Sequence, residues 1–235
     1  MSVVDVKFWA VVPAAGVGRR MGGDRPKQYL DLLGKTILER TLDRLLGHKD
    51  IAGVVVAISE GDEYWQDIAP RYTNSGLRVA QGGEERCHSV LNGLNDLSAI
   101  ASDSDWVLVH DAARPCLSDA DISNLIATLV NDEVGGILGI PVTDTIKRVG
   151  SENSIETTVD RTALWRALTP QMFRLPLLQK SLTDALDAGV LVTDESSAIE
   201  WAGYTPKIVE GSPDNIKITL PQDLWLAESY LKRVN

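Results

Sequence analysis

A glycine-rich, basic segment at residues 13–30 is the part of this 235-residue chain whose composition points most directly to chemistry. It combines small residues with four glycines, four cationic side chains and one acidic residue, Asp24. Small residues let a backbone approach a ligand closely, and consecutive exposed N–H groups form a site for phosphate. A surface turn with solvated charges does not account for glycines and cations together, so we predict an anion-binding loop.

Two better-known glycine motifs do not match this segment. A dinucleotide-binding fingerprint, G-x-G-x-x-G, fits Gly16 and Gly18, but Met21 occupies the position of the third glycine. A phosphate-binding loop of the form G-x-x-x-x-G-K-[ST] does not occur in the chain. Both motifs depend on those glycines to bring the backbone to a phosphate. The sequence therefore favours neither an enzyme that binds a nicotinamide cofactor nor a P-loop nucleoside triphosphatase.

The overall charge limits the partners that the chain can have. It has 33 Asp and Glu residues against 23 Lys and Arg, a net charge of −10, which repels nucleic acid and anionic membranes. The longest apolar runs are far shorter than the roughly 20 residues that span a bilayer. The N-terminal residues show no secretory pattern. We expect a cytosolic protein that binds neither nucleic acid nor membrane.

The cysteines and histidines give no familiar metal pattern. Cys87 and Cys116 are too far apart for a C-x-x-C pair, and two cysteines do not form a disulfide framework. His48, His88 and His110 have no zinc-site spacing. We expect both cysteines to be reduced and partly buried, and no transition metal to be held by the protein.

Short apolar runs alternate with segments of helical period along the chain. The runs at 8–12, 54–58, 77–80, 106–109 and 136–140 are typical of strands in a buried, largely parallel sheet. Between them, apolar residues at 37–46, 90–97 and 122–129 recur with the period of an amphipathic helix. Ser118, three residues before Asp121, predicts a capping box at the start of the last of these. The alternation indicates a layered α/β domain.

The segment 142–162 interrupts this alternation. Residues 146–149 and 155–159 are polar and β-branched, and a turn-like stretch joins them. We predict a β-hairpin arm that leaves a single domain spanning 1–235. Helical spacing returns at 175–186, a short strand is expected at 206–209, and an amphipathic helix at 224–231 closes the chain.

Nine motifs along the whole chain resemble those of a known family. They are Pro13-Ala-Ala-Gly-x-Gly-x-Arg20-Met, Pro26-Lys-Gln-Tyr, Gly82-Gly-x-Glu-Arg86-x-x-Ser89-Val, Val109-His-Asp-Ala-Ala-Arg-Pro-Cys116, Asp144-Thr-Ile-Lys147, Val159-Asp-Arg161, Leu168-Thr-Pro-Gln171, Thr193-Asp-Glu195 and Asp214-Asn-Ile-Lys217. The first two mark the wider sugar-nucleotidyltransferase group. The other seven resemble the 2-C-methyl-D-erythritol 4-phosphate cytidylyltransferases of the non-mevalonate isoprenoid pathway. The resemblance implies a Rossmann-like layered nucleotidyltransferase domain with a mostly parallel central sheet and a protruding β-arm.

The implied reaction joins a substrate phosphate to the α-phosphorus of CTP and releases pyrophosphate. A phosphate monoester, with a second pKa of about 6, is already mostly a dianion at pH 7, so the reaction needs no general base. It needs cations, backbone N–H groups and Mg²⁺ to position and stabilise anionic groups. By resemblance, Arg20, Lys27 and Lys217 are the catalytic cations, and the backbone of Ala14, Ala15 and Gly16 contacts the nucleotide.

Recognition of cytosine is assigned by resemblance to Gly83 and Ser89. Without the resemblance, the Gly82-Gly83 pair is equally well interpreted as a turn, and Ser89 as a hydroxyl near a helix start.

Asp111 follows an apolar strand, and a carboxylate together with a triphosphate is a usual way to hold Mg²⁺. The alternative is a salt bridge between Asp111 and Arg114 that needs no metal. The resemblance favours Asp111 near the nucleotide and the metal.

The phosphosugar positions implied by the resemblance are Arg114, Thr145, Arg161, Thr169 and Thr193. Two of them, Thr145 and Arg161, fall in the arm. An isolated hairpin is marginal in water, so the arm is expected to pack against a second subunit in a homodimer and to serve the neighbouring site. A solvent-exposed loop is the alternative to such an arm.

Two other functions of the protein remain open: a D-ribitol 5-phosphate cytidylyltransferase, and a non-catalytic nucleotide-binding module on the same fold.

Overall fold

A computed structural model of the chain describes residues 6–16 and 25–233. Its α-helices and β-strands follow in the order β1 (Phe8–Pro13), β2 (Asp31–Leu32), β3 (Lys35–Thr36), α1 (Ile37–Gly47), β4 (Ile51–Ile58), α2 (Glu63–Ile68), β5 (Leu77–Gln81), α3 (Arg86–Ser98), β6 (Trp106–Val109), α4 (Asp119–Leu129), β7 (Gly135–Pro141), β8 (Ile146–Val149), β9 (Ile155–Val159), β10 (Trp165–Arg174), α5 (Leu175–Asp187), α6 (Glu195–Trp201), β11 (Lys207–Glu210) and α7 (Pro221–Arg233). Short 3₁₀ turns are η2 (Lys27–Tyr29), η3 (Ala69–Tyr72) and η4 (Ser151–Asn153).

The central sheet has seven strands in the order β11-β7-β10-β6-β1-β4-β5. All pairs are parallel except those of β10, which runs antiparallel to both β6 and β7. The chain therefore winds outward in both directions from β1. A ligand binds such a sheet outside the carboxyl ends of the strands where the winding reverses, which places the expected site beyond β1 and β6.

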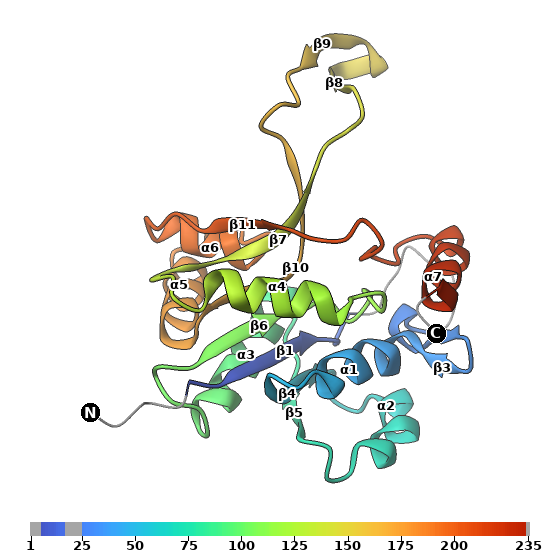
Figure 1. The fold of residues 1–235 in the computed structure, drawn as a ribbon, viewed down its shortest axis with the longest axis vertical. Helices are drawn as coiled ribbons and strands as arrows, with labels where there is room; N and C mark the ends of the chain where they lie inside the picture. Colours follow the sequence, from blue (N-terminus) through green and yellow to red (C-terminus); the bar gives the residue numbers. More distant parts are fainter. Residues whose placement is uncertain (1–5, 17–24, 234–235) are drawn as a thin grey trace.

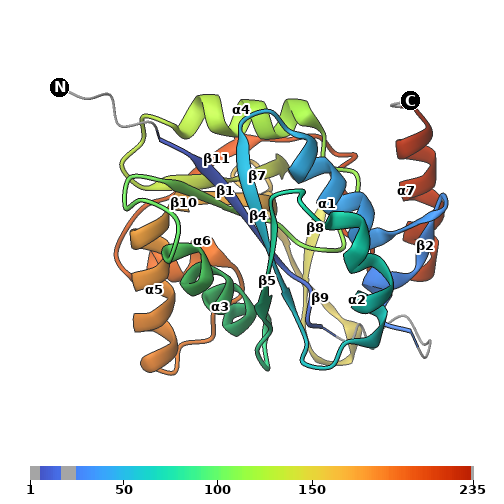
Figure 2. The ribbon, with the colours of Figure 1, turned by 90° about the horizontal axis from the view of Figure 1, so that it is seen from below.

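Helices cover both faces of the sheet (Figures 1 and 2), and apolar side chains pack in a separate core on each face. Alternate side chains of β1 face opposite cores: Ala10 and Val12 pack with α1 and α4, whereas Val11 packs with α3, α5 and α6. This alternation is the two-residue period of a strand buried on both sides. The predicted layered α/β fold with a mostly parallel sheet is confirmed.

Five of these α-helices and β-strands were not predicted from the sequence: β10, the two-residue strands β2 and β3, and the short helices α2 and α6. The apolar pattern of β10 is interrupted by Pro170, and proline argues against a central strand because it donates no ladder hydrogen bond. The structure accommodates it at a shift in the β10–β7 register between Ala167 and Gln171.

The capping box predicted at the start of α4 is confirmed in one of its two bonds. The Ser118 hydroxyl accepts the Asp121 N–H at 3.0 Å, but the Asp121 carboxylate accepts from the N–H of Ser212 at 2.9 Å.

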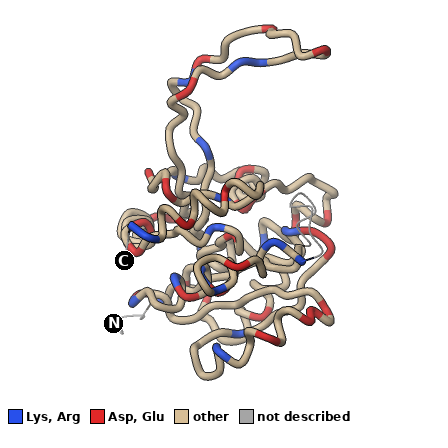
Figure 3. The backbone as a smooth tube through the Cα atoms, turned by 90° about the vertical axis from the view of Figure 1, so that its right-hand side faces the viewer, with Lys and Arg blue, Asp and Glu red and all other residues tan. Residues whose placement is uncertain are grey.

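The strands β8 and β9 form an antiparallel pair that projects from the sheet as an arm (Figure 1). The arm carries both basic and acidic residues and stands apart from the helices (Figure 3). Two of its apolar side chains, Val149 and Ile155, are 49% and 64% exposed. Over residues 6–16 and 25–233, no helix has the length and apolar character that crossing a membrane requires.

Candidate active site

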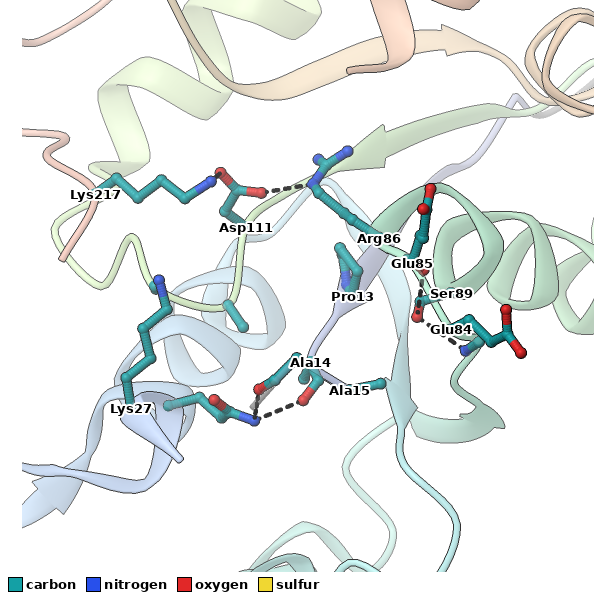
Figure 4. A pocket seen from close by; sticks show the side chains of 15 residues that line it. Pro13, Ala14, Ala15, Lys27, Glu84, Glu85, Arg86, Ser89, Asp111 and Lys217 are labelled. Atoms are coloured by element: carbon teal, nitrogen blue, oxygen red, sulfur yellow. Dashed lines mark hydrogen bonds and ion pairs between the residues drawn. The ribbon is translucent and has the colours of Figure 1, made fainter. Parts of the chain in front are cut away.

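A cavity of about 290 Å³ opens where β1 and β6 end and α3 begins (Figure 4). The described residues that line it include most of the predicted nucleotide-binding and catalytic positions. They are Pro13, Ala14, Ala15, Gly16, Lys27, Gln28, Gly83, Glu84, Glu85, Arg86, Ser89, Asp111, Ala112, Ala113 and Lys217. Residues 200 positions apart in the sequence thus meet at one edge of the sheet.

The backbone that leaves β1 is fixed by two side chains. The buried Gln28 amide donates to the carbonyl oxygens of Ala14 and Gly16 at 2.8 and 3.0 Å. The Ser59 hydroxyl donates to the Ala15 carbonyl at 2.8 Å. These bonds hold three consecutive carbonyl groups in place, as a backbone binding site for a nucleotide requires. Sequence reasoning did not assign a role to Gln28.

Asp111 is the centre of a cluster of charges. Its Oδ1 is 2.9 Å from Nε of Arg86, and its Oδ2 is 2.9 Å from Nζ of Lys217 and 3.5 Å from Nε of Arg114. Burial would raise the pKa of the Asp111 carboxyl, but these cations together hold it well below its usual range. Asp111 is therefore ionised at neutral pH and is too weak a base to accept a substrate proton.

Arg86 joins Asp111 to a second buried carboxylate. Two of its guanidinium nitrogens donate to Oε1 and Oε2 of Glu195 at 2.7 and 3.0 Å. Glu195 is fully buried, in the first turn of α6. Although burial acts to lower the pKa of Arg86, the two carboxylates raise it overall. Arg86 and Glu195 belong to recognised motifs, but sequence reasoning gave them no role, and only the tertiary contact reveals one.

A hydrogen-bonded chain behind Asp111 orients its backbone. The Asp111 N–H donates to Oγ1 of Thr169 at 3.1 Å, and that hydroxyl donates to Nδ1 of His110 at 3.0 Å. The other ring nitrogen of His110 then donates to the Arg114 carbonyl at 3.0 Å. Burial lowers the pKa of His110 to about 4, so its ring is neutral and serves as a fixed bridge. Thr169 is buried, and its hydroxyl already holds two partners.

The segment that carries Lys217 is tied to the loop after β6 and to the loop before α1. The Ile218 N–H donates to the Ala113 carbonyl at 2.9 Å, and the Arg114 guanidinium donates to the Asn215 carbonyl at 2.7 Å. Lys27 Nζ donates to the Ile218 carbonyl at 3.1 Å. The two predicted catalytic lysines are therefore held on one side of the cavity, as Figure 4 shows.

The opposite side of the cavity is formed by Gly83, which follows Gly82, and by the start of α3. A Cβ atom added to Gly82 would lie 2.3 Å from the Ala15 Cβ, and one added to Gly83 would lie 2.4 Å from the His88 Cβ. Both positions need glycine because of this close approach. The Gly83 N–H donates to Oγ of the buried Ser89 at 3.0 Å, and that hydroxyl donates to the Glu85 carbonyl at 3.2 Å.

A second cavity, of about 300 Å³, lies beside the first and shares Lys217 with it. Three cations line it: Arg114, Arg166 and Lys217. Arg114 is buried, and burial lowers the pKa of its guanidinium. Such a basic cavity next to the first one is suited to an anionic ligand.

Other predicted site residues lie elsewhere. Thr145 and Arg161 are exposed at the base of the arm, where the Arg161 guanidinium donates to the Thr143 carbonyl. Thr193 is exposed just before α6, and its N–H donates to the Ser197 hydroxyl at 3.2 Å. None of these three is among the described residues that line the first cavity. Arg20 lies outside the described residues.

Comparison with known proteins agrees with this geometry. The model of the family 2-C-methyl-D-erythritol 4-phosphate cytidylyltransferase matches residues 8–233. The chain is 54% identical to the enzyme of that name from Pseudomonas entomophila over 237 residues, covering 99% of this chain and 100% of the relative. It is 57% identical to that from Vibrio parahaemolyticus over 224 residues, covering 95% of each.

Solved structures agree with the sequence comparison. A crystal structure of a 4-diphosphocytidyl-2C-methyl-D-erythritol synthase superposes with a TM-score of 0.85 at 37% identity, covering 97% of this chain and 100% of the other. The Francisella tularensis 2-C-methyl-D-erythritol 4-phosphate cytidylyltransferase superposes with a TM-score of 0.78 at 36% identity, covering 95% and 99%. On these matches and on the charge cluster around Asp111, the chain belongs to the 2-C-methyl-D-erythritol 4-phosphate cytidylyltransferase family.

Proposed function

We propose that the chain is a cytidylyltransferase that joins CTP and 2-C-methyl-D-erythritol 4-phosphate. The products are 4-diphosphocytidyl-2-C-methyl-D-erythritol and pyrophosphate, in the non-mevalonate synthesis of isoprenoid precursors. The observation that carries this proposal is the pair of adjacent cavities that share Lys217, with Asp111 and Arg114 in contact between them. We assign the nucleotide to the first cavity and the phosphosugar to the second.

The reaction follows from charge stabilisation. A phosphate oxygen of the sugar attacks the α-phosphorus of CTP, the bond to the β-phosphate oxygen breaks, and pyrophosphate leaves with that electron pair. The attacking phosphate is largely a dianion at neutral pH, so no group has to remove a proton. Asp111, with its lowered pKa, and the neutral, fully buried His110 are both unsuited to that task. Their role is to position the cations.

We propose Arg20, Lys27 and Lys217 as the cations that stabilise the transition state. The ion pair with Asp111 and the bond to the Ile218 carbonyl support this assignment for Lys217 and Lys27, because they fix the two ammonium groups before substrates bind. Preorganised charges cost no reorganisation as charge develops on the reacting phosphate.

We assign the cytosine contact to Gly83 and Ser89 and the nucleotide backbone contacts to Ala14, Ala15 and Gly16. Both residues line the first cavity, and the bond from the Gly83 N–H to the Ser89 hydroxyl holds them together, which supports the first assignment. A site that pairs polar groups with one base rejects a base that leaves them unpaired. CTP is therefore the expected nucleotide.

We propose Mg²⁺ as the cofactor, with Asp111 near it. Both Asp111 oxygens already contact cations, so a metal held by this protein carboxylate alone does not fit. The site fits an ion that enters with the triphosphate, because Asp111 lines the cavity assigned to the nucleotide. When bound, Mg²⁺ would supply neutralisation of the phosphate charges.

One assay tests the catalytic proposal. Pyrophosphate release is measured with each of the four nucleoside triphosphates crossed against 2-C-methyl-D-erythritol 4-phosphate and D-ribitol 5-phosphate. We expect release with CTP and the methylerythritol phosphate. Faster release with ribitol phosphate would make the chain a ribitol-phosphate cytidylyltransferase. Nucleotide binding without release in any combination would indicate a non-catalytic module.

We further propose that two chains form a homodimer through the arm at 142–162, so that Thr145 and Arg161 serve the partner's site. The exposure of Val149 and Ile155 supports this, since a two-stranded hairpin with exposed apolar side chains gains stability by packing. Arg161 carries a guanidinium suited to phosphate, but lies at the base of the arm, away from its own chain's first cavity.

We assign Arg114, Thr169 and Thr193 to the phosphosugar in the same chain. A cytosolic location stays a prediction.

Mixed dimers test the shared site. Lys27→Ala and Arg161→Ala are each expected to be nearly inactive alone. After joint unfolding and refolding, one site of each mixed dimer would combine an intact Lys27 with an intact Arg161, and activity should return. Mixed dimers that are demonstrably present but as inactive as their parents would exclude the shared site.

A further inference from the structure

We propose that Glu85, Cys87 and His88, at the start of α3, form a binding site for a soft divalent cation such as Zn²⁺. One carboxylate oxygen of Glu85, Sγ of Cys87 and one ring nitrogen of His88 all lie within 4.8 Å of one another. The Cys87 thiol also donates to Oε2 of Glu85 at 3.7 Å. Three different donor types therefore lie in one cluster.

These donors are those that zinc uses in proteins. Zn²⁺ binds thiolate at about 2.3 Å and imidazole or carboxylate at about 2.0–2.2 Å, so tetrahedral ligands lie roughly 3.3–3.8 Å apart. The Cys87–Glu85 distance of 3.7 Å is already within that range. A thiolate and an imidazole disfavour Mg²⁺ and Ca²⁺, which take oxygen ligands. The proposed site is therefore chemically distinct from that of the metal expected with the triphosphate.

The local backbone places these three residues close together at the start of α3. Glu85 is the extended N-cap residue of α3, and Cys87 and His88 lie in the first helical turn. His88 packs against Gly83 so closely that a Cβ added there would lie 2.4 Å from its own. Cys87 is buried, whereas Glu85 is exposed, so the site has an anchored sulfur and an open side toward solvent. Three protein ligands with a fourth position left to water make an open zinc site, unlike the closed four-ligand structural sites.

Binding replaces one bond at the sulfur. The Cys87 S–H bond breaks, its proton passes to the solvent, and the sulfur lone pair forms the bond to the cation. No oxidant or reductant is needed. Zinc affinity should therefore rise with pH, with one proton released from the thiol for each cation bound.

Cobalt titration of the whole protein tests the proposal. Co²⁺ is added to the metal-free, reduced chain, and the near-ultraviolet charge-transfer band of a cobalt thiolate is recorded. We expect one Co²⁺ per chain, a band that Zn²⁺ displaces, and loss of the band in Cys87→Ser. The matched control is Cys116→Ser, which removes the other free buried cysteine, whose thiol donates to the Ala227 carbonyl at 3.7 Å. This variant should keep the band.

A second variant guards against misfolding of Cys87→Ser. His88 is only partly buried, so His88→Gln should fold and should weaken Co²⁺ binding by at least about 10-fold, since even the loss of outer-shell partners costs that much. The proposal is overturned if the parent protein shows no thiolate band at saturating Co²⁺, if the band survives Cys87→Ser, or if His88→Gln binds Co²⁺ as tightly as the parent. None of these readouts depends on nucleotide transfer, so the proposed activity stands or fails separately.

Discussion

The pairing of Arg86 with Glu195 is expected to support the active site, and Glu195→Gln tests it. The substitution preserves shape but removes a negative charge from a fully buried position. Gln keeps one oxygen for one of the two Arg86 N–H groups that now donate to the carboxylate at 2.7 and 3.0 Å. Arg86 would then retain Asp111 as its remaining anionic partner among the contacts described.

The size of the expected loss in the free energy of unfolding follows from the burial of Glu195. Two unit charges about 4 Å apart attract by about 4 kcal/mol at an effective dielectric constant of about 20. The hydrogen bond that Gln retains restores about 1 kcal/mol. We therefore expect Glu195→Gln to lower the free energy of unfolding by about 3 kcal/mol, the low end of the range for a broken buried pair. With a urea dependence of about 3 kcal/mol/M, the unfolding midpoint should fall by about 1 M at pH 7.

The chain offers a matched control in Asp96→Asn. Arg78 donates to Asp96 through two nitrogens at 2.7 and 3.1 Å, nearly the geometry of the Arg86–Glu195 pair, but its side chain is 43% exposed. An exposed pair contributes at most about 1 kcal/mol, so this midpoint should move little. If both variants shift the midpoint equally, burial does not determine the strength of the Arg86 pair, and the reasoning is wrong.

Three further predictions concern the same site. Lys27→Ala should lower kcat by about 10²–10³ with little change in CTP affinity, because a cation that acts in the transition state affects turnover; a raised KM with normal kcat in steady-state assays would contradict its role. Gly83→Ala should raise the KM for CTP and lower stability by about 1–3 kcal/mol, since its Cβ would approach His88 to 2.4 Å; unchanged kinetics and urea midpoint would show that the contact is relieved at no cost. The pKa of His110 is about 4 in the folded protein and about 6.5 in the unfolded chain, so the unfolded state binds more protons between these pH values. The free energy of unfolding should therefore fall as the pH is lowered from 6.5 to 4, by up to about 3 kcal/mol. Urea unfolding across this range should show a smaller loss in His110→Gln, and equal losses would mean that His110 is not buried in its neutral form.

Several features of the site were predictable from sequence because their signals are local. The glycines and cations at 13–30 and the acidic residue shortly after an apolar run pointed to Ala14, Lys27 and Asp111, and the structure brings them to one cavity. The two interpretations offered for Asp111 were a metal site and a salt bridge to Arg114. The structure shows the ion pair, at 3.5 Å, together with pairs to Arg86 and Lys217.

The sequence by itself determined the layered α/β fold, because apolar runs and helical periods report which faces of each element are buried. Only the tertiary structure decided which strand lies between β6 and β7 and which charges meet. β10 contains Pro170, which interrupts its apolar pattern. The sequence pattern does not reveal that β10 stays paired with β7 on either side of this proline through a shift in register. Arg86 and Glu195 are 109 residues apart, and their contact depends on which loops the sheet order brings together. Sequence periodicity carries no information about such pairs, since their energy arises only once the fold brings both partners to the same edge of the sheet and buries Glu195.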